Sequence, residues 1–438
     1  MTEPATEPVT ASPASAGGIP FTALAAEFGT PLYVYDGAVL AQRFGTLRAA
    51  LHPRLELFFS LKSNPNLSVY AFLHGLGARA EVSSRAELHT AFRAGAGPAN
   101  TIFLGPGKSA AELADAVSAG IAAIVCESFQ ELALIDRIAA EQGVAARVAL
   151  RVNPAFTVKG AGLAMGGVPR QFGIDEAALL DGPADLAARH PHLRLIGVHV
   201  YMGTRIMAEE VVVENTARIL DLSERLAAHL GFPLELVDVG GGLGVAYFDG
   251  ETDLDPAVLA EGINPLIAGF AERHPGARLV MELGRYLAAD AGTYVAAVRY
   301  TKESMGRRFA VADGGTNHHM AAVGIGSLVH RNFPIRLLNR SAAPGEPTGP
   351  WQLTGPLCTP VDLFGRNVEL PELRPGDLIG IDRSGAYGPS ASPTGFLSHG
   401  HPAEVLVVDG TAHLVRRRET LEDLMRHQIL YTERIEAS

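Results

Sequence analysis

Short apolar runs alternate with amphipathic stretches between about residue 55 and residue 285. In the stretches 109–119 and 128–140, apolar residues recur at helical spacing, which predicts helices. Eight βα units of this kind predict a closed (β/α)8 TIM barrel, whose chemistry lies at the C-terminal ends of its strands. An open doubly wound sheet is the competing architecture. The eight runs, each typical of a strand buried on both faces, are 57–61, 80–83, 101–104, 122–126, 147–152, 195–200, 236–239 and 278–282.

After residue 290 the pattern changes to short strands separated by Gly, Pro, Asn and Asp turns. One helix is expected near the end, at 421–429, with Thr420 as its N-cap. We therefore predict a barrel domain over 31–290 and a mostly β domain, a β-barrel or sandwich, over 291–438, with residues 18–30 packing on it. The first 17 residues are rich in Pro, Thr, Ala and Ser and are expected to be disordered. The predicted strands of the β domain are 295–300, 308–311, 351–353, 377–381 and 403–408.

Composition excludes several classes of protein. The net charge of −11 argues against nucleic acid as a partner. No run of 18 apolar residues occurs, so a membrane span is not expected. The two cysteines, Cys126 and Cys358, offer neither a disulfide framework nor zinc spacing, which favours a reducing, cytoplasmic location.

Lys62 is one of only four lysines in the chain and follows the apolar first run. Burial at the end of a barrel strand disfavours the ammonium form, so we expect a lowered pKa and a nucleophilic amine that can join a carbonyl cofactor. A lysine that extends from the strand end to solvent is the alternative.

Other chemically useful side chains also fall at predicted strand ends. Gly240–Gly242 form a turn whose free N–H groups can hold a phosphate, with Arg285 one strand away as a further donor. Glu282 needs a cation when buried, and a protonated pyridine nitrogen is one. A tight turn and a structural Glu282–Arg285 pair are the plainer interpretations. The remaining strand-end candidates are Glu81, Arg151, Asn153, His199 and Tyr201.

In combination these motifs resemble the fold-type III pyridoxal-phosphate decarboxylases, the family of ornithine and diaminopimelate decarboxylases. The resemblance runs from about Pro31 to Val407. It is carried by Phe-Ser-Leu-Lys-Ser-Asn at 59–64, Arg-Gln-Phe-Gly-Ile at 170–174, Gly-Gly-Gly at 240–242, Glu-Leu-Gly-Arg at 282–285, Gly-Pro-Leu-Cys-Thr-Pro-Val-Asp at 355–362 and Gly-Ala-Tyr-Gly at 385–388.

The resemblance implies a role for each matching residue. Lys62 joins the cofactor covalently, and Glu282 pairs with the pyridinium nitrogen, which deepens the electron sink that decarboxylation requires. Cys358 returns a proton to Cα; a small buried apolar residue is the alternative for this position. The resemblance also implies a head-to-tail homodimer with shared active sites, because the loop of Cys358 and Asp362 enters the neighbouring subunit. The predicted cofactor-binding residues are Lys62, Glu81, His199, Tyr201, Gly240, Gly241, Gly242, Glu282, Gly284, Arg285 and Tyr387.

Three departures from the family concern the substrate. Thr359 replaces the acidic residue that meets a distal ammonium, no arginine occurs between Asp313 and Arg331, and Tyr201 replaces the histidine that stacks on the ring. The predicted substrate-binding residues are Asn317, His318, Thr359 and Asp362. Adjacent His318 and His319 point oppositely on a strand, so we expect no metal site.

These departures are similar to those of the branch that decarboxylates carrier-linked or conjugated amino acids in antibiotic or siderophore pathways. We therefore expect PLP-dependent α-decarboxylation of such a substrate. Decarboxylation of diaminopimelate or another free amino acid is the alternative. An amino-acid racemase and a non-catalytic PLP-binding regulator are further alternatives. Glu282 argues against the racemase, because racemases of this fold prefer an arginine near the ring nitrogen.

Overall fold

The computed structural model describes residues 14–157, 163–323, 331–342 and 345–431 and divides into two compact units. One unit is formed by Tyr35–Gly292 and Arg383–Ser390. The other is formed by Met1–Val34, Thr293–Asp382 and Ala391–Ser438. Each unit has its own sheet and its own core. No helix in the described ranges is long and apolar enough to span a membrane.

The first unit is a closed barrel of eight parallel strands, counted over the described residues. Each predicted run is confirmed as a strand, and every strand end lies within two residues of the prediction. The pairing of β7 with β8 closes the sheet, so the open doubly wound alternative is wrong. In barrel order the strands are β4 (Leu55–Ser60), β5 (Arg79–Val82), β6 (Thr101–Phe103), β7 (Ala123–Cys126), β8 (Ala146–Asn153), β11 (Leu193–His199), β13 (Leu236–Gly241) and β14 (Arg278–Leu283).

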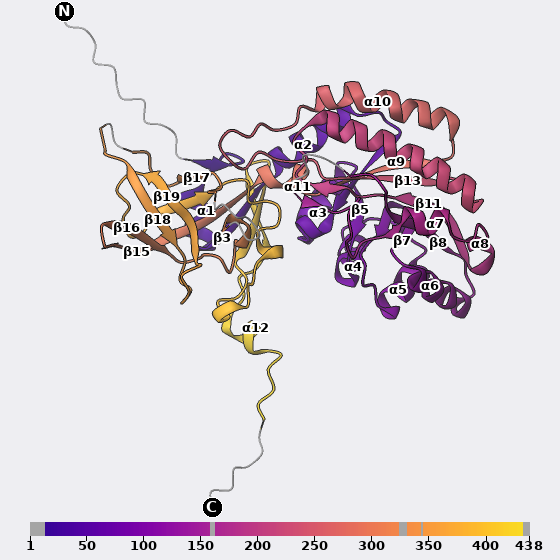
Figure 1. The fold of residues 1–438 in the computed structure, drawn as a ribbon. Helices are drawn as coiled ribbons and strands as arrows, with labels where there is room; N and C mark the ends of the chain where they lie inside the picture. Colours follow the sequence, from indigo (N-terminus) through magenta and orange to yellow (C-terminus); the bar gives the residue numbers. More distant parts are fainter. Residues whose placement is uncertain (1–13, 158–162, 324–330, 343–344, 432–438) are drawn as a thin grey trace, which may run out of the picture. The chain divides into compact units, whose positions relative to one another are not determined.

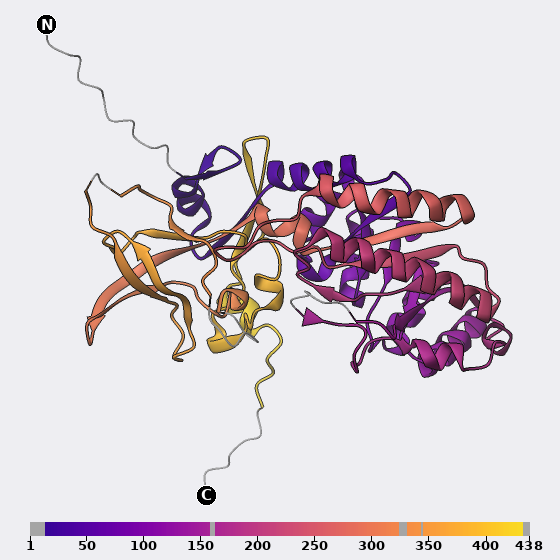
Figure 2. The same cartoon turned by 45° about the horizontal axis from the view of Figure 1, so that its top comes forward.

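Helices between the strands form the outer layer of the barrel, and their ends follow local sequence. Helix α5 (Ala110–Ala119) begins with a capping box made by Ser109 and Glu112 and ends at Gly120 in the left-handed conformation. Figures 1 and 2 show α9 (Glu209–Leu230) and α10 (Pro256–Arg273) side by side on the outside. The remaining helices of four or more residues in this unit are α2 (Gly37–Ala50), α3 (Leu67–Gly75), α4 (Arg85–Arg93), α6 (Phe129–Gln142), α7 (Glu176–Leu180), α8 (Leu186–Arg189) and α11 (Arg285–Ala288).

The second unit is built on a mostly antiparallel sheet. The strand β3 (Leu32–Asp36) lies between β15 (Gly292–Ser304) and β21 (Ala403–Val408) in this sheet, although it precedes the barrel in sequence. Leu32, Val34, Val295 and Val405 meet in the core of the unit. The other strands of this sheet are β16 (Arg307–Ala312), β17 (Ile335–Leu337), β18 (Gly349–Thr354), β19 (Leu363–Leu370), β20 (Leu378–Ile381) and β22 (Thr411–Arg416).

Two predictions for the chain ends were wrong. The terminal helix α12 spans only Leu421–Met425, because Leu421, Met425 and Ile429 are exposed and find no surface to stabilise further turns. Residues 15–17 were expected to be disordered, but Ser15–Ala16 pair with Ile19–Pro20 and Ala16 is buried in the core. The rest of the predicted tail, 1–13, lies outside the described residues.

Candidate active site

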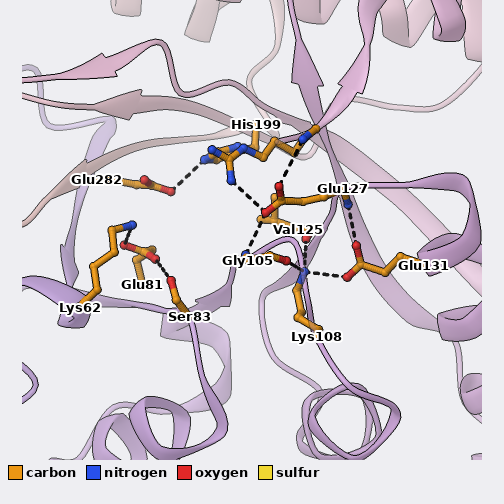
Figure 3. A network of polar contacts seen from close by, with 12 residues as sticks. Lys62, Glu81, Ser83, Gly105, Lys108, Val125, Glu127, Glu131, His199 and Glu282 are labelled. Atoms are coloured by element: carbon orange, nitrogen blue, oxygen red, sulfur yellow. Dashed lines mark hydrogen bonds and ion pairs between the residues drawn. The ribbon is translucent and has the colours of Figure 1, made fainter. Parts of the chain in front are cut away.

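Lys62 lies in a single 3-10 turn, Leu61–Ser63, that continues β4. Its Nζ lies 2.9 Å from Oε2 of Glu81, which is fully buried on β5. Ser83 Oγ donates a hydrogen bond of 2.9 Å to the other oxygen of Glu81 (Figure 3). The exposed part of Lys62, 38% of the side chain, lines a cavity that Gly242 also lines. Lys62 therefore faces the triple-glycine turn, and the alternative of a lysine that extends to open solvent is wrong.

The predicted lowering of the Lys62 pKa is not found. Burial lowers the pKa, but the negative charges of Glu81 and Glu282 outweigh burial and raise it. The amine is therefore held as an ammonium ion at neutral pH until a proton leaves the site. Glu81, in direct contact with Nζ, is the carboxylate placed to receive it.

Glu282 is buried at the end of β14 and accepts a hydrogen bond from His199, with 3.0 Å between His199 Nε2 and Glu282 Oε1. Burial would raise the pKa of Glu282, but the positive charges of His199, Lys62 and Arg151 lower it. Its second oxygen, Oε2, is buried without a hydrogen-bond partner among the described residues. The structure shows no Glu282–Arg285 ion pair in the same ranges, so the structural pair considered from sequence is wrong.

Gly240–Gly242, at the end of β13, bring the backbone too close to β14 and to the segment that follows β11 for any side chain. A Cβ at Gly242, where φ is +90°, would lie 2.1 Å from the carbonyl oxygen of Gly203. The same cavity wall holds Arg285, whose Nη1 donates to the hydroxyl of Tyr247 at 2.9 Å. Arg285 also lies over the ring of Tyr387, 4.6 Å from its centroid. This wall therefore combines a guanidinium, a phenol and open backbone, the donors that a phosphate requires.

The segment Arg383–Ser390 delivers Tyr387 to the barrel. The backbone N–H of Tyr387 donates to the carbonyl oxygen of Ser63 at 2.7 Å, next to Lys62. Asn64 Nδ2 donates to the carbonyl oxygen of Gly385 at 2.9 Å and fixes the same segment. Gly284 is needed nearby, because a Cβ there would lie 2.9 Å from that of Ser63. These short contacts fix the position of Lys62 relative to Tyr387.

A cavity of about 410 Å³ extends from Lys62 toward the strand ends of β6 and β8. Tyr201 lines it, with Lys62 Nζ 5.9 Å from its ring centroid. Burial raises the pKa of Tyr201 to about 12, so the ring presents a neutral face. The apolar part of its lining consists of Leu104, Pro106, Met165 and Phe172, beside the polar side chains of Ser83 and Arg151.

Sequence reasoning missed a buried network behind this wall. Glu127, at the end of β7, accepts hydrogen bonds from Arg151 Nη1 at 2.9 Å, the N–H of Gly105 at 3.0 Å and the N–H of Gly173 at 3.2 Å. Lys108 donates to Glu131 Oε1 at 2.6 Å and to the carbonyl oxygens of Gly105 and Val125 (Figure 3). The signal was present: Glu127 directly follows a predicted strand, as Lys62 does. Asp238, an acid inside an apolar run, was missed in the same way.

The cavity walls described above contain residues of the barrel unit alone. Five predicted site residues lie instead in the second unit: Asn317, His318, Cys358, Thr359 and Asp362. Cys358 is exposed, so the alternative of a buried apolar residue is wrong. Asp362 is buried and accepts hydrogen bonds from the N–H groups of Thr316 and Leu357, both 2.7 Å, which shape its loop. The imidazole of His318 contacts the carbonyl oxygen of Gly400 at 2.9 Å and the hydroxyl of Tyr294 at 3.3 Å.

The residues present fit a phosphorylated pyridine aldehyde. Glu282 Oε2 lacks a hydrogen-bond partner among the residues that the structure describes, and a pyridinium N–H would supply one. The amine of Lys62 faces the same space, and Gly242, Arg285 and Tyr387 line the wall where a phosphate would bind. A (β/α)8 barrel with this arrangement defines a PLP-dependent barrel enzyme.

Comparison with known proteins gives the family. The model of the pyridoxal-dependent decarboxylase pyridoxal-binding domain matches residues 38–289. L-Glutamyl-[BtrI acyl-carrier protein] decarboxylase of Niallia circulans is 37% identical over 410 residues, covering 93% of this chain and 96% of that protein. Diaminopimelate decarboxylase of Helicobacter pylori strain J99 is 32% identical over 404 residues, covering 92% and 96%. The chain belongs to the family of PLP-dependent decarboxylases.

Solved structures agree with this assignment. The structure of Helicobacter pylori diaminopimelate decarboxylase complexed with L-lysine is similar with a TM-score of 0.82 and 30% identity, covering 93% of this chain and 98% of that one. The diaminopimelate decarboxylase of M. jannaschii in complex with L-lysine gives a TM-score of 0.86 and 27% identity, covering 96% and 97%. The fold and the reaction class predicted from sequence are thereby confirmed.

Proposed function

We propose that this decarboxylase acts on an amino acid joined to an acyl-carrier protein, with glutamyl as the acyl group, in an antibiotic- or siderophore-type pathway of the cytoplasm. The observation that carries the proposal is the similarity to the glutamyl-carrier decarboxylase, which extends over nearly the full length of both chains. The α-amine must be free to join the cofactor and the α-carboxylate must be free to leave. The carrier is therefore attached through the side-chain carboxyl of the glutamyl group.

The charges near the substrate support an esterified side chain. Thr359 and Pro360 follow Cys358 and offer no anion to a distal ammonium. No arginine occurs between Asp313 and Arg331 to bind a distal carboxylate. The apolar wall of Leu104, Pro106, Met165 and Phe172 suits a neutral acyl chain better than an ionised one.

The residue roles of the proposal follow from the site. When bound, pyridoxal phosphate supplies the electron sink for the charge left on Cα. Lys62 is the attachment amine, Glu81 takes up its proton, and Glu282 faces the ring nitrogen. Arg285, Tyr387 and Gly240–Gly242 hold the phosphate, and Tyr201 covers the ring.

The second unit completes the site in a head-to-tail homodimer. Exposed Cys358 donates the proton that Cα receives, from the loop of the neighbouring subunit. Thr359 faces the substrate, whereas Asn317 and His318 are buried in the second unit and act through its packing. Asp362 acts through the loop, because its hydrogen bonds hold the 355–362 segment to Thr316.

The test is a decarboxylation panel. Carbon dioxide release is measured from γ-glutamyl-pantetheine thioester, the same acyl group on a carrier protein, free glutamate and free diaminopimelate. We expect turnover of the thioesters and at least a hundredfold lower kcat/KM for the free acids. A Thr359→Glu variant should move the preference toward diaminopimelate by restoring an anion. Efficient release from free diaminopimelate by the native enzyme would contradict the proposed substrate and leave the reaction class intact.

A further inference from the structure

Three buried ionisable side chains meet on the inner face of adjacent strands. His199 on β11 lies in register with Asp238 on β13, and Gly241 on β13 lies in register with Glu282 on β14. One nitrogen or oxygen from each side chain lies within 4.8 Å of the others. His199 and Asp238 are fully buried and Glu282 is 2% exposed. The proposed contact with the pyridine nitrogen explains why Glu282 is buried here, but it does not explain the burial of His199 and Asp238.

The charges that face this cluster leave His199 as the partner of Glu282. Lys62 is paired with Glu81, and Arg151 is paired with Glu127. Tyr201 stays neutral at physiological pH, because burial raises its pKa to about 12. The imidazole is therefore the one described cationic or donor group that contacts Glu282 directly without serving another carboxylate.

Asp238 holds a proton rather than a charge. One of its oxygens accepts the N–H of Gly240 at 2.9 Å. Its other oxygen, Oδ2, and Glu282 Oε2 are both buried without partners in the described ranges. Burial and the charge of Glu282 raise the pKa of Asp238 well above its usual range. A neutral carboxylic acid beside an ionised one avoids the repulsion that two buried anions would suffer.

We propose that His199 and Asp238 are positioning residues that keep Glu282 ionised and direct its free oxygen at the ring nitrogen of the cofactor. His199 donates from Nε2 and fixes the carboxylate plane. Asp238, anchored by Gly240 of the phosphate turn, supplies the neutral neighbour. The inference rests on the proposed role of Glu282 and is independent of the substrate.

The experiment follows the absorption band of the reconstituted enzyme between pH 5.5 and pH 9, without substrate. The native band should stay constant, because the ring proton is held by an ionised Glu282. His199→Leu removes the donor, so the band should titrate inside this range. The cofactor dissociation constant should rise about tenfold to a hundredfold, the range of a lost charge-assisted hydrogen bond. His199→Gln, which restores an N–H donor, should recover most of both effects.

Asp238 is tested with a conservative pair. Asp238→Asn keeps a donor in place of the carboxylic proton and should leave the band close to native. Asp238→Ala should disturb it. If Asp238→Asn makes the band titrate as strongly as His199→Leu does, the charge of Asp238 is required and the proton assignment is overturned.

A purely structural role would give a different result. It predicts that His199→Leu melts at a lower temperature as apoenzyme but binds cofactor with a native, pH-independent band. A stoichiometric divalent metal in the native apoenzyme, lost in His199→Leu, would also overturn the proposal. If His199→Leu does not fold, the pH dependence of the absorption band is compared between His199→Gln and Asp238→Ala instead. If no substrate of the decarboxylation panel is turned over, the proposed function is contradicted, but the result of this titration still holds.

Discussion

Lys62 and Glu81 form an ion pair with 2.9 Å between Nζ and Oε2, and Glu81 has no exposed surface of its own. The pair holds the amine protonated, although only the free amine attacks an aldehyde. The charge of Glu81 therefore sets the pH at which Lys62 becomes free to attach the cofactor.

Substitution of Glu81 should move the pH dependence of cofactor attachment. Glu81→Gln removes the largest influence that raises the pKa of Lys62, so more of the amine is free at a given pH. The rate of reconstitution of apoenzyme, followed by absorption, should reach half its maximum at a lower pH than in the native protein. Glu141→Gln, at a position whose side chain is 61% exposed, is the control. An unchanged pH profile in Glu81→Gln would refute the coupling.

Substitution of Arg285 should weaken cofactor binding. Arg285→Met removes a charge-assisted phosphate contact and should raise the dissociation constant of pyridoxal phosphate about tenfold to a hundredfold. Tyr247→Phe removes the hydroxyl that orients Arg285 and should raise it about two- to tenfold. Equilibrium dialysis measures both, with exposed Arg137→Met as the control. Native affinity in Arg285→Met would place the phosphate elsewhere.

Substitution of Lys108 should lower stability rather than prevent attachment of the cofactor. All three protons of Lys108 are donated, and its side chain is 2% exposed, so its role is structural. Lys108→Met leaves Glu131 buried without its cation and should lower the free energy of unfolding by about 3–5 kcal/mol. Urea unfolding followed by the helical circular dichroism signal measures the loss, and exposed Lys302→Met should be neutral. A Lys108→Met protein of native stability that fails to retain the cofactor would contradict this assignment.

Acid should destabilise the second unit through His319. Burial lowers the pKa of His319 to about 4, below the ordinary value of 6.5 for an unfolded chain. The stabilising effect of the neutral ring is thus present above pH 6.5 and is lost as pH falls toward 4. Trp351, the only tryptophan and buried in the same unit, reports unfolding by fluorescence.

The His319→Phe variant should lose less stability than the native protein between pH 6.5 and pH 4. The Phe ring still packs against Phe333 and Tyr33 and cannot take up a proton. The neighbouring buried His318, whose pKa burial also lowers to about 4, still titrates and accounts for the loss that remains. Exposed His413→Phe is the matched control and should follow the native curve. Parallel native and His319→Phe curves would show that another group carries the acid sensitivity.

Sequence was informative wherever local pattern decides structure. The barrel strands were predictable because residues such as Phe58, Ile102 and Val280 are buried on both faces and form continuous apolar runs. The strand β3 was missed, because only its pairing with β15 and β21 assigns it to the second sheet.

The electrostatics of the site were less predictable than its residues. Lys62 and Glu282 stood out because a charged group ends an apolar run. The pKa of Lys62 could not be inferred, since it depends on Glu81 and Glu282, which lie on β5 and β14, the two strands that flank β4. The hydrogen bond between His199 and Glu282 likewise joins residues 83 positions apart, and no spacing in the sequence predicts it.

The central claim is that Lys62 is the amine that joins the cofactor, and reduction with borohydride followed by peptide mapping tests it most directly. Reconstituted enzyme should carry one pyridoxyl group on the peptide that contains Lys62, and Lys62→Ala should carry none. A pyridoxyl group on Lys108 or Lys302, or a native absorption band in Lys62→Ala, would contradict the account.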